Sequence, residues 1–189
     1  MTGKTVTQTR STLTQVVEPG HANFLGKMFG GALLSFIDLA AYTTASKFAG
    51  NICVTASFDR VDFHEPIEVG EVITLDGWVS YAGRTSVEVT IDVTSENILT
   101  GVRRETNQAR VTMVAIKDGR PTPVPELVCE THDERLQYLR GKLRKERRFA
   151  SRAEFDAICK RLEGLSQPQI EELMVAKDLM HHPIVEDAT

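Results

Sequence analysis

The sequence predicts an α+β fold, in which a twisted antiparallel sheet wraps around one long central helix. Two observations lead to this prediction. From Ala32 to Phe48 the chain is apolar on nearly every side, as a fully buried helix is. After this stretch, four consecutive segments alternate between apolar and polar residues, as strands with one buried face do. A sheet that curves around the helix is the arrangement that buries such a helix most naturally.

The elements follow one another as one strand, one long helix and four strands. The first strand is expected over residues 5–17, from their threonine and valine content. Glycines at positions 20, 26, 30 and 31 then mark a loop that leads into the helix. The four alternating segments are 53–63, 72–82, 85–96 and 106–118. The connections between them are typical of antiparallel neighbours.

A segment with three prolines, 118–127, is expected to end the sheet region. Residues 1–127 are therefore predicted to form the first domain. The remaining residues, 128–189, are rich in charge and predict a helical extension of two or three helices packed outside the sheet.

The composition excludes several classes of protein. With 41% hydrophobic and 25% charged residues it is that of an ordinary globular protein, and the net charge of -4 gives no general attraction to nucleic acid or to an anionic membrane. No apolar stretch approaches the ~20 residues of a membrane span, and the N-terminal segment lacks the core of a signal peptide. Cys53, Cys129 and Cys159 are odd in number and far apart, which favours a reducing cytoplasm over a disulfide framework or a zinc site. We therefore expect a cytoplasmic protein without a metal and without a nucleic-acid or membrane partner.

One ionisable residue, Asp38, lies in the middle of the predicted helix. Ser35, Asp38 and Tyr42 are spaced i, i+3, i+7, so they share one face and form a narrow polar seam. An unpaired buried carboxylate is costly, so Asp38 needs a partner, a change of its protonation or a wet cleft. Two interpretations stay open. Asp38 is either a core residue satisfied by Ser35 or by a neighbouring strand, or the general base or nucleophile of an active site.

Two glycines, Gly30 and Gly31, precede the predicted helix, where the first backbone N–H groups have no acceptor within the helix. These groups lie at the positive end of the helix dipole and can hold the oxygen of a polarised carbonyl. A glycine pair by itself is more often just a tight turn. With Asn23 seven residues before the pair and Asp38 seven residues after it, the spacing indicates a site.

Over roughly residues 10–120 the chain resembles the hotdog-fold acyl-CoA thioester hydrolases. The resemblance is carried by "HANFLGKMFGGALLSFID", "CVTASFDRVDFHEPIEVGEVITL" and "GRTSVEV", in the family's order and spacing. It implies the fold predicted above and the hydrolysis of acyl-CoA to a free fatty acid and CoA, with no metal or cofactor. It also matches Asn23 and Asp38 to the asparagine and the helix acid of the family.

Spacing along the helix predicts that two chains form the site. Asp38 lies about 10 Å beyond Gly31 at 1.5 Å per residue, whereas a general base must come within ~3 Å of the group it activates. Two chains with antiparallel helices side by side would bring the Asp38 of one chain to the Gly31 of the other. The resemblance agrees, because the family's active sites lie between two hotdog folds and relatives often assemble as trimers of dimers.

The reaction expected from this arrangement begins with the thioester carbonyl bound at Gly30 and Gly31. Asn23 would orient the water or the carbonyl, and Asp38 would act as general base or as nucleophile. Two other functions of this fold stay open. A non-catalytic acyl-CoA sensor of this fold normally carries a DNA-binding segment, and a hotdog hydratase or dehydratase normally pairs a histidine with a carboxylate. For the latter, His21 is the candidate, and no motif supports it.

The resemblance also points to residues that would contact CoA: Ala56, Ser57, Thr85, Ser86 and Val87. The alternative for each is ordinary strand alternation followed by a turn at Gly83. Arg84 would either reach a phosphate or be a solvated turn residue.

A basic segment, 135–152, carries eight basic residues against one acidic residue. Arg140, Arg144, Arg147 and Arg148 follow i, i+4, i+7, i+8 and line one helical face. Arginine matches phosphate with paired donors, so Arg144, Arg147 and Arg148 are expected to bind the phosphates of CoA. A solvated helix face is the alternative, and RNA binding is disfavoured because no aromatic residues are interleaved.

Overall fold

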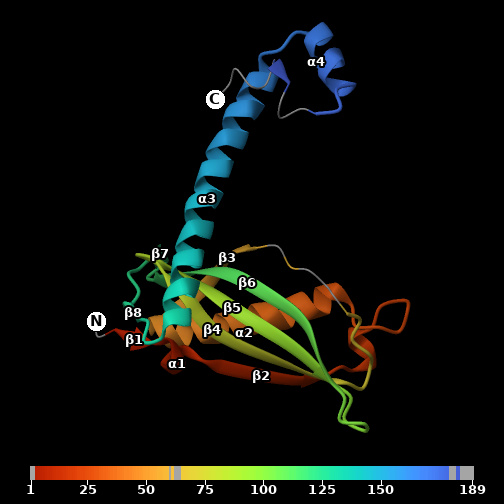
Figure 1. The fold of residues 1–189 in the computed structure, drawn as a ribbon, viewed down its shortest axis with the longest axis vertical. Helices are drawn as coiled ribbons and strands as arrows, with labels where there is room; N and C mark the ends of the chain where they lie inside the picture. Colours follow the sequence, from red (N-terminus) through yellow and green to blue (C-terminus); the bar gives the residue numbers. More distant parts are fainter. Residues whose placement is uncertain (1–2, 60, 62–64, 179–181, 184–189) are drawn as a thin grey trace. The chain divides into compact units, whose positions relative to one another are not determined.

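The computed structural model describes residues 3–59, 61, 65–178 and 182–183 (Figure 1). The chain forms two compact units, Met1–Gly141 and Lys142–Thr189. The domain boundary expected at residue 127 stays a prediction. The sheet and the residues of the candidate active site belong to the first unit.

The first unit is built on a sheet of six strands in the described part of the chain, and all its pairings are antiparallel. Five of the strands lie in the order β2-β4-β5-β6-β3, and β7 pairs with β6. Their bounds are β2 Ser11–Val16, β3 Ile52–Phe58, β4 Val72–Ala82, β5 Ser86–Glu96, β6 Arg103–Lys117 and β7 Arg120–Pro121. The predicted antiparallel sheet is therefore confirmed. Part of the strand expected over residues 53–63, namely residues 60, 62 and 63, lies outside the described residues.

Helix α2 (Gly30–Ala49) is the predicted central helix, and the sheet curves around it (Figure 1). Its buried residues join one hydrophobic core with residues of β4, β5 and β6: Leu33, Ile37, Ala41, Ala45 and Phe48 from the helix, and Ile73, Leu75, Val89, Ile91 and Val111 from the strands. Each large side chain in this core contributes about 1.5–3 kcal/mol by leaving water. At Gly77 of β4 the helix comes so close that a Cβ atom would lie 2.6 Å from Thr44 Oγ1.

The apolar composition of the helix predicts burial on nearly every side, but one side of α2 is exposed. Ser35, Leu39, Tyr42 and Thr43 are exposed on the side that faces away from the sheet. The physical reason is that a curved sheet covers only one side of a helix. The neighbouring edge strand β3 also exposes apolar side chains, which are Ile52, Val54 and Phe58.

The strand expected over residues 5–17 is wrong in its first half. Helix α1 (Val6–Thr9) separates β1 (Lys4–Thr5) from β2. Thr5 begins this helix, because its hydroxyl accepts from the Gln8 backbone N–H while the Gln8 side chain accepts from the Thr5 N–H. The same threonine content that favours strands also supplies helix caps.

The predicted C-terminal helical extension is present as α3 (His132–Glu163) and α4 (Gln167–Met174). Strand β8 (Leu127–Val128), which precedes it, pairs in parallel with β1. Within the first unit, Tyr138 at the start of α3 packs against Tyr81 of β4, with ring centroids 5.0 Å apart. Within the second unit, Ser166 and Gln169 form the cap of α4, and Leu173 is buried.

Candidate active site

The loop before α2 folds around the side chain of Asn23. The Asn23 Oδ1 atom accepts from the backbone N–H groups of Leu25 and Lys27, at 2.9 and 3.2 Å, and the Asn23 N–H donates to the Lys27 carbonyl at 2.7 Å. This is a turn closed by a side chain, for which asparagine is well suited. The amide Nδ2 of Asn23 makes no hydrogen bond to another described residue, so it is a donor that a ligand can use.

A pocket of about 350 Å³ opens beside this loop and the start of α2. It is lined by Asn23, Leu25, Lys27, Met28, Gly30, Leu33, Glu65, Pro66 and Ile67. The structure thus brings the predicted Asn23 and Gly30 to one cavity. Phe29, the residue before the helix, provides no side-chain cap, so the N–H groups of the first turn, including that of Gly31, keep their donor capacity.

Asp38 takes its partner from a neighbouring strand. The Thr55 hydroxyl of β3 donates to Asp38 Oδ1 at 2.5 Å, whereas Ser35 donates to the Ala32 carbonyl at 2.7 Å. Thr55 therefore fixes the direction of the Asp38 carboxylate. Asp38 is half-buried and lies beside the exposed face of α2, so it is accessible to a ligand.

The sequence does not point to Thr55, because a threonine in an alternating strand carries no signal of its own. It lies next to a bulge, since the pairing of β3 with β6 shifts between Thr55 and Ser57 and leaves Ala56 without a partner in the register. Bulges often occur beside active sites, where they change the direction of a side chain.

The two segments expected to contact CoA lie on either side of one β6 residue, Met113. The register places Thr55 of β3 and Val87 of β5 opposite Met113 from its two sides. Val87 as a whole residue is 1% exposed and belongs to the core. The next β6 residue, Thr112, likewise lies between the two strands, opposite Ser57 of β3 and Glu88 of β5.

The turn between β4 and β5 is held by backbone hydrogen bonds. The Thr85 carbonyl accepts from the Ala115 N–H at 3.0 Å, and the Arg84 carbonyl accepts from the Val124 N–H at 3.0 Å. The Arg84 side chain is exposed, and Ser86 begins β5. This geometry fits both a solvated turn and a ligand contact, so the roles of Arg84, Thr85 and Ser86 stay predictions.

The basic residues Arg144, Arg147 and Arg148 lie on α3 within the second unit. Arg147 is exposed, and Arg144 and Arg148 are half-buried. Their role in binding phosphate stays a prediction.

The cysteines are free thiols in the described structure. Burial raises the pKa of Cys53, and burial together with the nearby Glu134 carboxylate raises the pKa of Cys129, so neither is an activated nucleophile. Among the described residues, no group of histidine, cysteine and acidic side chains has the geometry of a metal site. No helix in the described ranges has the length and hydropathy needed to cross a bilayer.

Comparison with known proteins gives a consistent result. The family model described as the thioesterase superfamily matches residues 25–102. The acyl-CoA thioester hydrolase YkhA of Bacillus subtilis, itself uncharacterised, is 35% identical over 77% of this chain and 87% of its own length. A crystal structure of an apo-hexameric acyl-CoA thioesterase is 41% identical, covers 81% of this chain and 99% of that one, and superposes with a TM-score of 0.76.

An acyl-CoA hydrolase of Staphylococcus aureus, solved with butyryl-CoA and CoA, is 34% identical over 85% of this chain and 98% of its own, with a TM-score of 0.74. Its alanine variants at one asparagine, one aspartate and one threonine were also solved. Those positions are 15 and 17 residues apart, which are the intervals from Asn23 to Asp38 and from Asp38 to Thr55. The chain belongs to the hotdog-fold acyl-CoA thioester hydrolases of the thioesterase superfamily.

Proposed function

We propose that this protein hydrolyses acyl-CoA to a free fatty acid and CoA, with Asn23, Gly31, Asp38 and Thr55 at its active site. The observation that carries the proposal is the Asp38 carboxylate, held by Thr55 beside the open face of α2. Membership of the family supports the reaction class, and the matching intervals in the Staphylococcus aureus variants support the residues.

The thioester carbonyl binds at the start of α2, with its oxygen toward the Gly31 N–H. As negative charge develops on this oxygen, the N–H donor stabilises it, and loss of one such donor typically raises the barrier by about 3–4 kcal/mol. Asn23 lies beside Gly30 in the same pocket, and its Nδ2 group donates a second hydrogen bond to the carbonyl or to the attacking water.

Asp38 completes the chemistry in one of two ways. As general base it accepts a proton from water while the water oxygen attacks the carbonyl carbon. As nucleophile it attacks the carbon itself and forms a short-lived anhydride, which water then cleaves. In both cases the carbon–sulfur bond breaks and the CoA thiolate takes up a proton. Neither route needs a metal or a cofactor.

The site is shared between two chains. Gly31 and Asp38 of one chain are about 10 Å apart along α2, and Asp38 does not line the pocket at the helix start. A second copy placed against α2 and β3 would cover their exposed apolar side chains, Leu39, Tyr42, Ile52, Val54 and Phe58. The hexameric relative supports assembly of such dimers into a trimer of dimers.

The CoA moiety contacts Ala56, Ser57, Arg84, Thr85 and Ser86, and phosphate is bound by Arg144, Arg147 and Arg148. The protein acts in the cytoplasm, where its thiols stay reduced. It needs neither a nucleic-acid nor a membrane partner.

A thiol-release assay over acyl-CoAs from acetyl to palmitoyl tests the proposal. We expect release of CoA, with a chain-length preference set by the pocket. Binding of acyl-CoA without release of thiol would favour the sensor function, and consumption of an enoyl-CoA without release of thiol would favour a hydratase.

A further inference from the structure

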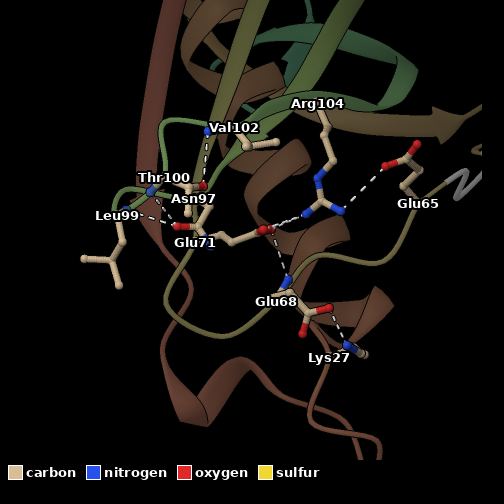
Figure 2. Close-up of polar contacts among 9 residues, drawn as sticks. All are labelled: Lys27, Glu65, Glu68, Glu71, Asn97, Leu99, Thr100, Val102 and Arg104. Atoms are coloured by element: carbon tan, nitrogen blue, oxygen red, sulfur yellow. Dashed lines mark hydrogen bonds and ion pairs between the residues drawn. The ribbon is translucent and has the colours of Figure 1, made fainter.

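An ion pair with a buried carboxylate lies at the segment 65–71, of which Glu65, Pro66 and Ile67 line the pocket (Figure 2). Glu71, the residue before β4, is 5% exposed. Both of its carboxylate oxygens accept from Arg104 Nη2, at 2.6 and 2.8 Å, and Oε2 also accepts from the Glu68 backbone N–H at 3.1 Å. Neither Arg104 nor Glu71 lines the pocket.

The Glu71 carboxylate, through its hydrogen bond with the Glu68 N–H, spans the tight turn 68–71. The Glu71 N–H donates to the Glu68 carbonyl at 3.2 Å, and Gly70 has a φ of 91°, the left-handed value that the third residue of such a turn requires. At the other end of the segment, Arg104 Nη1 lies 3.6 Å from the Glu65 carboxylate. One guanidinium therefore holds both ends of segment 65–71 against β6, as Figure 2 shows.

This segment in turn holds the Asn23 loop. The Met28 N–H donates to the Ile67 carbonyl at 2.8 Å, and the Lys27 side chain forms an ion pair with Glu68. Lys27 is also the residue whose backbone N–H and carbonyl bind Asn23. A continuous series of contacts thus runs from the buried carboxylate to the side chain at the pocket.

We propose that Arg104 and Glu71 are positioning residues for the thioester hydrolysis proposed above, on which this inference rests. The Lys27–Glu68 ion pair is partly exposed, and ion pairs of that kind contribute little to the stability of the fold. The Glu71 carboxylate is buried, so its partner cannot be removed without leaving an uncompensated charge. Arg104 is therefore the residue that anchors segment 65–71 and, through this segment, the Lys27 end of the Asn23 loop.

Adjacent arginines on β6 provide a matched test. Arg104→Gln removes the ion pairs of Arg104 with Glu71 and Glu65. Arg103→Gln makes the same change at an exposed residue, which donates to Thr94 Oγ1 at 3.1 Å. Displacing a reacting group by ~1 Å can cost ~100-fold in rate, so we expect Arg104→Gln to lower kcat per folded protein at least ~10-fold, with KM within ~3-fold. Arg103→Gln should match the wild type, and Arg104→Lys should recover part of the loss. If Arg104→Gln does not fold, Glu71→Gln, which keeps an acceptor for Arg104 and for the Glu68 N–H, takes its place.

Amide hydrogen exchange provides a readout that does not depend on activity. We expect faster exchange at the Lys27 and Met28 amides in Arg104→Gln than in Arg103→Gln, with the centre of α2 unchanged. Equal kcat and equal exchange in the two variants would overturn the proposal, and so would faster exchange with an unchanged kcat. If the wild type hydrolyses no acyl-CoA, the proposed function fails together with the catalytic consequence, while the exchange data still decide whether Arg104 holds the loop.

Discussion

Helices α2 and α3 place their charges in opposite ways. In α2, one carboxylate, Asp38, lies in the centre of an apolar sequence, and it meets a specific donor on a neighbouring strand. In α3, charged residues occur along most of the helix, with eight basic residues between positions 135 and 152. A charge in an apolar helix has a free-energy cost that a partner or a function must offset, whereas charges on an exposed helix cost little.

A charge therefore carries more information about function in α2 than in α3. In α2, Asp38 stands out because it is the one carboxylate in an apolar helix. The fold provides its partner, Thr55, which lies next to a bulge in β3. In α3 the arginines lie on one face, but the same spacing occurs in any solvated amphipathic helix. Only the match of arginine to phosphate suggests a binding role for them. We expect the effects of substitutions to follow the same order.

The largest effect is expected from Asp38→Asn. The change is nearly isosteric and the new amide oxygen can still accept from Thr55, so the fold should persist while the base is lost. We expect kcat to fall ~100- to 10,000-fold if Asp38 is a general base, and further if it is the nucleophile. Turnover is measured beside a melting curve. Full activity in a folded variant would exclude the mechanism, and a lower melting temperature with normal turnover would make Asp38 a structural residue.

The shared site is tested by mixing two inactive proteins, Asp38→Asn and Asn23→Ala. A mixed dimer keeps one complete site, so equal mixing should restore up to about one quarter of the wild-type activity in a two-fold symmetric dimer. Subunit exchange is verified by mass spectrometry. If mixed dimers form and no activity returns, each chain carries its own complete site.

The fold could be predicted from the sequence where one face of an element is buried against one core. The strand expected over residues 72–82 has the same bounds as β4, and the central helix begins two residues before Ala32 and ends one residue after Phe48. Period-two alternation and an uninterrupted apolar stretch are properties of the segment itself, so they can be recognised without its neighbours.

The site could be predicted only in part, because its remaining features depend on contacts between distant segments. Three such features depend on how the sheet curves, which no local sequence pattern encodes. They are the Thr55–Asp38 hydrogen bond, the exposed face of α2 and the Arg104–Glu71 ion pair. Asn23 and Gly31 could be proposed from their spacing around the helix start and from the resemblance to the family, and their roles stay predictions.

A smaller effect than that of Asp38 is expected from Thr55→Val, which keeps the shape of the side chain and removes its hydroxyl. A hydrogen bond to a charged group contributes about 1.5–3 kcal/mol, so kcat should fall ~10- to 100-fold. Thr12→Val is the matched control, because Thr12 donates to Asp76 at 2.5 Å between two strands on the opposite edge of the sheet. Equal losses in both variants would mean that the Thr55 hydroxyl has no special role at the site.

The smallest effect is expected in α3, from Arg147→Ala. Exposed phosphate contacts are screened by salt, so we expect KM for acyl-CoA to rise only ~3- to 10-fold with little change in kcat, and added salt to reduce the difference from the wild type. Lys142→Ala removes one positive charge from another face of the same helix and is the matched control. An acyl-pantetheine substrate, which lacks the nucleotide phosphates, should be hydrolysed equally by both variants and by the wild type. If Arg147→Ala weakens both substrates equally, or if the control raises KM by the same factor, the basic face of α3 is a solvated surface and the phosphates bind elsewhere.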